Sequence, residues 1–239
     1  MHPPVEIDGG YPKLSYIKRF NLLSGMSEQE MQRVAAMTRM TRHRRGDSIY
    51  LPGDFSGSIY FLKEGRIKIT GLSEDGHEVL LDIIGPGDIF GEAGAIQETA
   101  RTTAAQALED ALLCEIDRKD FVALLAMYPN MTLHVLKRVG FRLKKVEAKV
   151  LSLICKDVPT RLREALVDLI DVDCANTPHP PFKIGLTQQD VANLIGASRQ
   201  ETARALKELR DSGVLELRYR SIIVKAPEKL RSGEPFRVR

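Results

Sequence analysis

The sequence predicts an α+β protein in which a β-roll (jelly roll) is followed by a long helix and a winged helix-turn-helix. Three observations support this fold class: closely spaced short strands, a heptad pattern of apolar residues after them, and two short helices joined at a glycine near the C-terminal end. A chain of 239 residues suits one large domain or two small ones. We place the roll with an N-terminal helix at residues 1–128, the long helix at 129–157 and the helix-turn-helix at 158–239.

The strands of the predicted roll lie between Arg42 and Ile116, where runs rich in Ile, Leu, Val and Tyr alternate with Pro-Gly, Glu-Gly and Asp-Gly turns. Asp75-Gly76 is a strong hairpin signal, because a tight hairpin turn needs positive φ at both central residues. Many short strands at this spacing are typical of a sandwich or a roll. Before them, the segment from Leu14 to Met40 is predicted to be helical, with Ser27 and Glu30 spaced as a capping box.

The segment at residues 129–157 carries apolar residues at the a and d positions of a heptad repeat. A strict 3.5-residue period is the spacing at which two helices coil around each other, and Lys and Arg crowd the other positions. We therefore expect a long helix that forms a homodimer, with a helix lying on its own domain as the alternative. The predicted seam is Leu136, Val139, Leu143, Val146, Val150 and Leu153.

The segment at residues 187–212 divides into two predicted helices around Gly196, which suits the tight turn of a helix-turn-helix. Thr187 and Ser198 are good N-caps for these two helices, because their hydroxyls can accept from free backbone N–H groups. Three apolar residues of the second helix are expected to face inward: Ala203, Leu206 and Leu209.

The second of these helices carries Arg199, Gln200 and Arg204 near its exposed N-terminal end, where a recognition helix meets base edges. Arg can bond guanine through paired hydrogen bonds, and Gln can bond adenine. The following LELRYRSIIV predicts a β-hairpin wing. Double-stranded DNA is therefore the expected partner, with solvated surface charges as the alternative. The predicted DNA-contacting residues are Thr187, Gln188, Ser198, Arg199, Gln200, Thr202, Arg204, Lys207, Arg218 and Arg220.

The net charge of +3 is unevenly distributed along the chain. Lys and Arg number 14 against 19 Asp and Glu in residues 1–128, 7 against 2 in residues 129–157, and 14 against 11 in residues 158–239. An acidic front and a basic rear predict that a polyanion meets the rear half. From Arg199 to Lys225 there are seven basic residues against four acidic ones, the excess that phosphate binding needs.

Composition and cysteine spacing disfavour several classes of protein. No apolar run approaches the ~18 residues that span a bilayer, and the opening MHPPVEIDGGYPKL lacks the apolar region of a secretory signal. We therefore expect a cytoplasmic protein without membrane contact. Cys114, Cys155 and Cys174 are too scattered for a disulfide framework or a zinc site. His77 and His134 are the candidate haem ligands, but axial ligation demands a dedicated pocket, so we expect neither metal nor haem.

One stretch, FGEAGAIQETARTTAAQA at residues 90–107, sets Glu92 and Arg101 among small residues. No nucleophile backed by a base accompanies them, and the sequence has no catalytic triad, metal cluster or Walker loop. Hydrolysis of a phosphodiester would need an activated water or a metal ligand beside them. We therefore expect a site that binds and signals, and no enzymatic activity.

From about Ile17 to Val224 the chain resembles the cyclic-AMP receptor protein and fumarate–nitrate regulator (CRP/FNR) family of bacterial transcription factors. Three stretches carry the resemblance: SEDGHEVLLDIIGPGDIFGEAG, RTTAAQALED and LTQQDVANLIGASRQETARALKELRDSGVL. The family fold is a β-roll sensor, a long dimerising helix and a winged helix-turn-helix. The resemblance therefore implies a homodimeric regulator whose DNA-binding heads are reoriented onto a palindromic operator when a cyclic nucleotide binds the roll.

The resemblance also implies a role for the stretch at residues 90–107, because an FGE…R pattern forms the phosphate-binding cassette of nucleotide-binding members. Glu92 would accept from the ribose 2′-hydroxyl, and Arg101 would pair with the cyclic phosphate. Arg142 matches a family position that links the long helix to the cassette, and it could bond Glu92. A vestigial cassette, with these charges paired to each other or to the helix, is the alternative. The implied ligand-binding residues are Gly91, Glu92, Ala93, Arg101, Thr102, Thr103, Arg142, Val146 and Glu147.

The base of the nucleotide is open between adenine and guanine. The best-known cyclic-AMP receptor holds the adenine edge with a Thr-Ser pair on the long helix, where this chain has Val146 and Glu147. Thr102, directly after Arg101, resembles some cyclic-GMP-selective sites of kinases. We take cyclic AMP (cAMP) as the default ligand and cyclic GMP (cGMP) as the second. Haem or redox sensing, or DNA binding without an effector, are the further alternatives.

Two features of the C-terminal part bear on its partners. Many family members have an Arg-Glu pair at the position of the recognition helix where this chain has Arg199-Gln200. A glutamate accepts a hydrogen bond from cytosine, whereas a glutamine prefers adenine. We therefore do not assume that this protein reads the half-site that is usual for the family. The proline-rich loop at residues 174–182 matches the place where some family activators contact RNA polymerase. A plain linker is the alternative for that loop.

Overall fold

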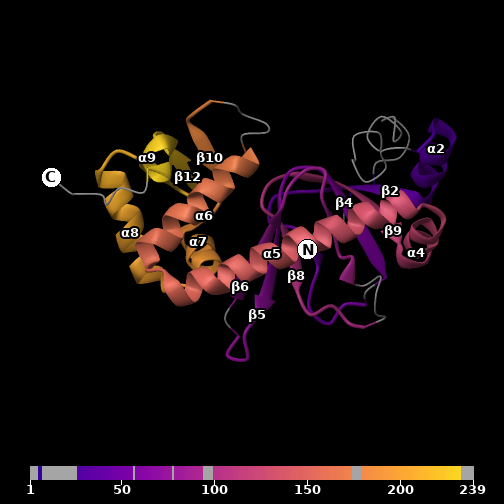
Figure 1. The fold of residues 1–239 in the computed structure, drawn as a ribbon, viewed down its shortest axis with the longest axis horizontal. Coiled ribbons are helices and arrows are strands. Elements are labelled where there is room, and N and C mark those ends of the chain that lie inside the picture. The colour runs from indigo at the N-terminus through magenta and orange to yellow at the C-terminus, as the bar shows by residue number, and fades with distance from the viewer. Residues whose placement is uncertain are drawn as a thin grey trace. The chain divides into compact units, whose positions relative to one another are not determined.

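The computed structural model describes residues 5–6, 26–55, 57–76, 78–93, 99–173 and 179–232 (Figure 1). The chain divides into two compact units. The first comprises Met1–Asp75 and Leu81–Lys144, and the second comprises Gly76–Leu80 and Lys145–Arg239. The long helix is therefore shared between the two units, and the three-part division at residues 128 and 157 stays a prediction.

The first unit is built on two antiparallel sheets, which confirms the predicted roll of short strands. One sheet has the order β1-β2-β9-β4-β7, and the other has the order β3-β8-β5-β6. The central pair places Ile59 opposite Ile116 and Phe61 opposite Cys114. The strands are β1 (Val5–Glu6), β2 (Thr38–His43), β3 (Ser48–Tyr50), β4 (Ser58–Glu64), β5 (Ile67–Leu72), β6 (Glu78–Ile84), β7 (Ile89–Phe90), β8 (Ala104–Ala107) and β9 (Ala111–Asp117).

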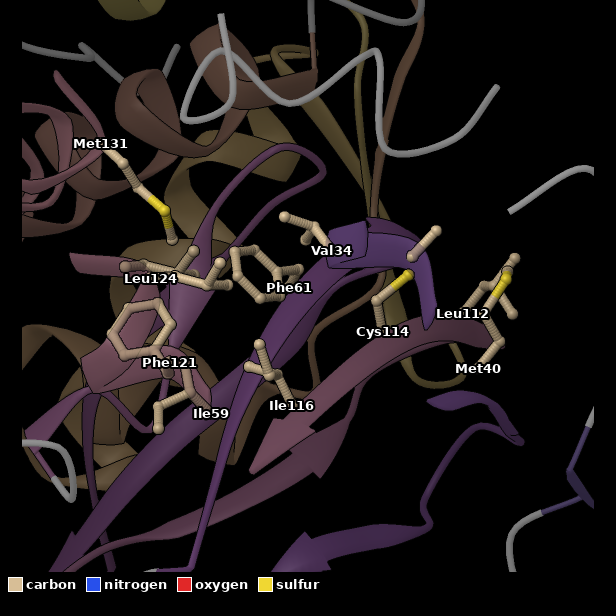
Figure 2. Packing of buried hydrophobic residues seen from close by; sticks show 12 residues of the cluster. Val34, Met40, Ile59, Phe61, Leu112, Cys114, Ile116, Phe121, Leu124 and Met131 are labelled. Atoms are coloured by element: carbon tan, nitrogen blue, oxygen red, sulfur yellow. The ribbon is translucent and has the colours of Figure 1, made fainter. Parts of the chain in front are cut away.

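An apolar core joins the first sheet to α4 (Arg118–Met127), as Figure 2 shows. Phe121 and Leu124 are three positions apart, so both project from one face of α4, and both are fully buried. The Phe121 ring meets that of Phe61 edge to face, with 6.1 Å between their centroids. Burying a side chain of this size contributes roughly 1.5–3 kcal/mol. The core therefore fixes β4 and β9, to which the neighbouring strands are bonded.

The N-terminal helix is shorter than the sequence predicts. Ser27 is the N-cap of α2 (Glu28–Met37), and it exchanges hydrogen bonds with Glu30, so the predicted capping box is confirmed. The prediction of helix up to Met40 is wrong, because β2 begins at Thr38 and pairs with β9 over its full length. The remainder of that prediction, at residues 14–25, lies outside the described residues.

The long helix is α5 (Pro129–Cys155), with 27 residues. Met131, in its first turns, is buried in the core of the first unit. The six predicted seam residues, by contrast, are each at least 40% exposed on the single chain. An apolar row of this length is unfavourable in water, and a second helix would cover it. Dimerisation through this apolar row stays a prediction.

The second unit is a winged helix-turn-helix, as predicted. Its three-stranded sheet has the order β10-β12-β11, and α6 contacts α7, α8 and α9 around buried leucines. None of the helices in the described part of the chain is long and apolar enough to cross a membrane. The elements are α6 (Val158–Asp173), β10 (Phe182–Ile184), α7 (Gln188–Ile195), α8 (Arg199–Asp211), β11 (Leu215–Arg218), β12 (Ser221–Val224) and α9 (Pro227–Arg231).

Candidate functional site

A cavity of about 320 Å³ lies in the roll beside the FGE…R stretch. Its walls come from strands β3, β5, β6 and β7, from the segments before and after residues 94–98, and from α5. The lining residues are Tyr50, Ile69, Asp82, Ile84, Phe90, Gly91, Glu92, Ala93, Thr99, Ala100, Arg101, Thr102, Thr103 and Arg142. Seven of the nine predicted ligand-binding residues therefore lie around one cavity.

Arg101 is a buried cation, with only 8% of its surface exposed. Its Nη1 donates to the Gly91 carbonyl at 3.2 Å, and its Nη2 donates to the Ser58 carbonyl at 2.5 Å. Within the described residues, its Nε is buried without a hydrogen-bond partner and no acid pairs with the guanidinium. A buried N–H that lacks a partner is costly, and each Nη also keeps one N–H group beyond its carbonyl bond. The guanidinium of this cavity-lining residue therefore has hydrogen-bonding capacity that the described residues do not use.

Gly91 is required by the approach of that guanidinium. Its φ of +78° is in the left-handed region, which a side chain disfavours. A Cβ at this position would lie 2.9 Å from Arg101 Nη1 and 3.2 Å from the Ser58 carbonyl oxygen. The glycine therefore leaves room for the arginine, whereas the family resemblance implies room for the ligand.

Glu92 is bonded to the long helix. Arg142 of α5 donates Nη1 to the Glu92 carboxylate and Nη2 to the Ile89 carbonyl, and its Nε lies 3.5 Å from Asp82 Oδ2. The bond between Arg142 and Glu92 that the family resemblance implies is therefore present, and the alternative of a vestigial cassette implies the same pairing of Glu92 with the helix. Because Arg142 forms ion pairs with acids and no described acid forms one with Arg101, the two cations of the cavity differ in their charge balance.

The small and hydroxyl residues of the stretch lie at the edge of the cavity. Ala93 and Thr102 are exposed, and Thr103 is half-buried with its side chain hydrogen-bonded to Tyr50. Val146 and Glu147 do not line this cavity; both are exposed on the part of α5 that belongs to the second unit. Their contact with a base stays a prediction.

Seven lining residues of the cavity are not among the predicted site residues, and two of these seven carry an ionisable group: Tyr50 at the end of β3 and Asp82 in β6. Tyr50 is buried with its ring centroid 4.1 Å from Arg101 Cζ, and burial raises the pKa of its hydroxyl. Each sits in an ordinary strand pattern and lies outside residues 90–107. A local pattern carries no signal for such residues, because strand pairing alone brings them to the cavity.

The candidate haem ligands do not form a site in the described structure. His77 lies outside the described residues, and His134 is half-buried on α5. In the described part of the chain, no group of three or more His, Cys, Asp or Glu side chains is arranged to hold a metal ion. Residues 174–178 of the predicted polymerase-contacting loop also lie outside the described residues.

The helix-turn-helix is formed by two capping boxes and a left-handed glycine. Thr187 caps α7 together with Asp190, and Ser198 caps α8 together with Glu201. Gly196 ends α7 at φ +61° and ψ +47°, and a Cβ there would lie 2.7 Å from Leu153 Cδ2. All three N-cap and turn predictions for this segment are therefore confirmed. Arg161 of α6 donates to the Ile195 and Gly196 carbonyls and so satisfies the end of α7.

Four of the predicted DNA-contacting side chains of α8 are exposed: Arg199, Gln200, Arg204 and Lys207. Ser198 is also exposed as the N-cap, while Thr187 and Gln188 are half-buried at the start of α7. Thr202 is a correction, because it is fully buried and its hydroxyl donates to the Ser198 carbonyl at 2.9 Å. Ala205 is buried where Ala203 was expected, and Ala203 is half-buried. The buried face of α8 is thus Thr202, Ala205, Leu206 and Leu209.

The predicted wing is the hairpin of β11 and β12, which pairs Arg218 with Ser221. Glu216 accepts from Arg218 at 2.7 Å and from Lys225 at 2.8 Å, and these bonds lower its pKa to about 2. Arg218 is therefore partly neutralised before any phosphate arrives. Arg220 is exposed at φ +57°, with Cζ 5.7 Å from the ring centroid of the exposed Tyr219.

Comparison with known proteins identifies both units. Residues 40–128 match the cyclic nucleotide-binding domain, and residues 160–232 match the Crp-like helix-turn-helix domain. The CRP-like cAMP-activated global transcriptional regulator of Mycobacterium tuberculosis (strain CDC 1551 / Oshkosh) is 28% identical over 210 residues, which are 84% of this chain and 92% of that protein. The cAMP-activated global transcriptional regulator CRP of Pasteurella multocida is 29% identical over 173 residues, 72% of this chain and 83% of that protein.

Solved structures support the fold. The c-di-GMP responsive global regulator CLP of Xanthomonas campestris has a TM-score of 0.70 at 23% identity, with 83% of this chain and 99% of that chain covered. FixK2 of Bradyrhizobium japonicum has a TM-score of 0.67 at 19% identity, with 82% and 96% covered. The chain belongs to the CRP/FNR family of transcription regulators, with a cyclic nucleotide-binding domain and a DNA-binding helix-turn-helix domain.

Proposed function

We propose that this chain is a homodimeric transcription regulator whose DNA binding is gated by a cyclic nucleotide, with cAMP as the default ligand and cGMP as the alternative. The observation that supports this proposal most strongly is the cavity of the roll. The buried Arg101 guanidinium in its lining has a donor without a partner among the described residues, and the Glu92 carboxylate in the same lining is an acceptor. A cyclic phosphate needs a guanidinium donor, and a ribose hydroxyl needs an acceptor. The protein would act in the cytoplasm, where its DNA is.

The charges around the cavity favour a ligand with one negative charge. Arg142 has Glu92 and Asp82 as acidic neighbours, whereas no acid among the described residues forms an ion pair with Arg101. A cyclic phosphodiester carries a single charge, which one guanidinium balances. A phosphate monoester carries up to two charges and would be balanced less well. Free 5′-AMP is therefore the proper negative control for the ligand.

The size of the cavity favours a mononucleotide over a cyclic dinucleotide. At about 320 Å³ it lies near the lower end of the range for small-molecule sites. Cyclic di-GMP, to which the Xanthomonas campestris regulator CLP responds, has two bases and two phosphates. The names of the curated relatives support adenine as the first base to test.

In this proposal the ligand acts on the long helix through Glu92. A ribose hydroxyl that donates to the Glu92 carboxylate would compete with Arg142 for its oxygen lone pairs. Since Arg142 lies on α5, a changed ion pair would alter the helix that carries the exposed apolar row. Ordinary allosteric coupling of this kind is worth about 1–3 kcal/mol.

The dimer would present two α8 helices to one DNA duplex. A symmetric pair reads half-sites about one helical turn, ~34 Å, apart, so the operator would be palindromic. Direct base contacts fall to the exposed Arg199, Gln200 and Arg204. If the regulator is an activator, we propose that residues 174–182 contact RNA polymerase.

Calorimetry with cAMP and cGMP, side by side, tests the ligand class. We expect saturable binding of at least one of them, with one ligand per chain, and none of 5′-AMP at the same concentrations. No heat with either cyclic nucleotide, from a sample shown to be folded, would contradict the proposal. A Soret band in the purified protein would support the haem-sensing alternative instead.

A further inference from the structure

Two kinds of contact hold the Arg101 guanidinium: hydrogen bonds to backbone carbonyls and an aromatic ring on one of its faces. Its two bonds to the Gly91 and Ser58 carbonyls lie in the guanidinium plane, because the N–H bonds of this planar group do. The ring of Tyr50 covers the guanidinium face, with Cζ 4.1 Å from the ring centroid. This distance is well inside the ~6 Å over which a ring attracts a cation.

Tyr50 itself is firmly held. Its ring stacks on that of Tyr60, with 6.0 Å between centroids, and lies 6.2 Å from that of Phe90. Its hydroxyl is hydrogen-bonded to the Thr103 side chain, which lies two residues after Arg101 and directly before β8. Burial raises the pKa of the hydroxyl, so the ring is a neutral phenol at pH 7. A fixed neutral ring can orient a cation without cancelling its charge.

Three of the five N–H donors of the Arg101 guanidinium remain unused by the described residues under these constraints. Within the described residues, Nε is buried and has no hydrogen-bond partner, and Nη1 and Nη2 each use one of their two N–H groups on a carbonyl. A change in the tilt of the guanidinium would move Nε and both carbonyl bonds together. The direction in which the remaining donors are offered therefore depends on the face contact as well as on the two carbonyls.

We propose that Tyr50 is a positioning residue for the anion site: its ring holds the Arg101 guanidinium so that the remaining N–H donors of this cavity-lining residue stay directed at an oxygen of a cyclic phosphate. The identity of that anion rests on the proposed function. The holding of Arg101 by Tyr50 does not, since it is a property of the protein without a ligand.

Tyr60 provides a matched control within the same core. It is the same residue type, it is also buried, and it packs in the same cluster as Tyr50. Its centroid lies 5.8 Å from Arg101 Cζ, at the limit of the attraction. Tyr60→Leu therefore removes similar packing but leaves the close ring on the guanidinium.

The test compares Tyr50→Leu, Tyr50→Phe and Tyr60→Leu with the wild-type protein. The Nε–H resonance of Arg101 in the ligand-free protein, assigned by its absence from Arg101→Leu, reports the ring above the guanidinium. Dissociation constants for the Rp and Sp phosphorothioate analogues of cAMP report which phosphate oxygen the arginine meets. If Tyr50→Leu fails to fold, Tyr50→Met fills the space with a flexible apolar side chain and serves in its place.

We expect Tyr50→Leu to lose the ring-current shift of the Nε–H, to bind cAMP about tenfold more weakly, and to discriminate less between the Rp and Sp analogues. Tyr50→Phe should stay within about threefold of the wild type, because it keeps the ring face. Tyr60→Leu should keep both the shift and the Rp/Sp ratio.

An unchanged Nε–H resonance in Tyr50→Leu, or an equal loss in Tyr60→Leu, would overturn the proposal. So would an unchanged Rp/Sp ratio in a Tyr50→Leu protein that binds nucleotide. If the wild-type protein binds neither cAMP nor cGMP, the proposed function fails, but the resonance in Tyr50→Leu and Tyr60→Leu still decides the role of Tyr50.

Discussion

Arg101→Leu is expected to abolish binding of cyclic nucleotide while the roll stays folded. The substitution removes a buried guanidinium that lines the cavity and keeps N–H donors unused by the described residues, which in the proposal meet the phosphate. Removing one partner of a buried, hydrogen-bonded charge pair costs about 2–5 kcal/mol, which is a loss of affinity of roughly 30-fold to several thousand-fold. Calorimetry with the nucleotide that the wild-type protein binds measures this loss directly.

Arg66→Leu is the matched control for this experiment. Arg66 is an equally buried arginine of the roll, but it is bonded to Glu109 through two 3.1 Å contacts and does not line the cavity. It should change stability without a specific loss of affinity. If Arg101→Leu binds as tightly as the wild type, or Arg66→Leu loses binding equally, the assignment of Arg101 to the phosphate is wrong.

Arg199→Ala is expected to remove most sequence-specific DNA binding while weak, salt-dependent binding persists. Arg199 is the first residue of α8 and is exposed, so its guanidinium can reach a base edge. One bidentate contact is worth about 1–3 kcal/mol of discrimination, so the affinity for the selected site should fall by roughly 5-fold to 150-fold. Competition between the selected site and random DNA at fixed salt measures this ratio.

Arg210→Ala tests whether that effect is local to the start of the helix. Arg210 lies in the last turn of α8, where it is bonded to Asp211 at 2.8 Å and 2.9 Å. Losing this exposed charge should leave the discrimination between sites unchanged. If the Arg199→Ala protein keeps the wild-type footprint and the same competition ratio, α8 does not read bases through this residue.

The parts of the fold that depend on local chemistry could be predicted from the sequence. The caps Ser27, Thr187 and Ser198 each bond their own helix three residues on, so the signal and the structure share one short segment. Gly196 is likewise a local requirement, set by a left-handed backbone. The end of α2 was misplaced because pairing with β9, more than 70 residues away, overrides the preference of residues 38–40.

The candidate site could be predicted only in part, because its walls come from separate strands. Glu92 and Arg101 share one recognisable stretch, and a family position pointed to Arg142. Tyr50 and Asp82 lie on β3 and β6 of one sheet, and the pairing of its strands, rather than a pattern around either residue, brings them to the cavity. The contact that makes Gly91 necessary, with Arg101 Nη1, is also set by the fold.

The error at Thr202 has a specific cause. A polar side chain on a helix is usually placed on the exposed face, but a threonine hydroxyl can donate to the carbonyl four residues earlier. Thr202 does so with Ser198, which makes its full burial inexpensive. Ala203 and Ala205 carry too little apolar surface to fix the orientation of the helix by pattern alone.

The most direct test of the central claim is DNA affinity with and without nucleotide. A site is first selected from random duplexes in the presence of cAMP, and affinity for it is then measured at fixed salt. We expect a palindromic site whose affinity rises about 5-fold to 150-fold on saturation with cAMP or cGMP, and no rise in Arg101→Leu. Equal affinity with and without both nucleotides would contradict the account.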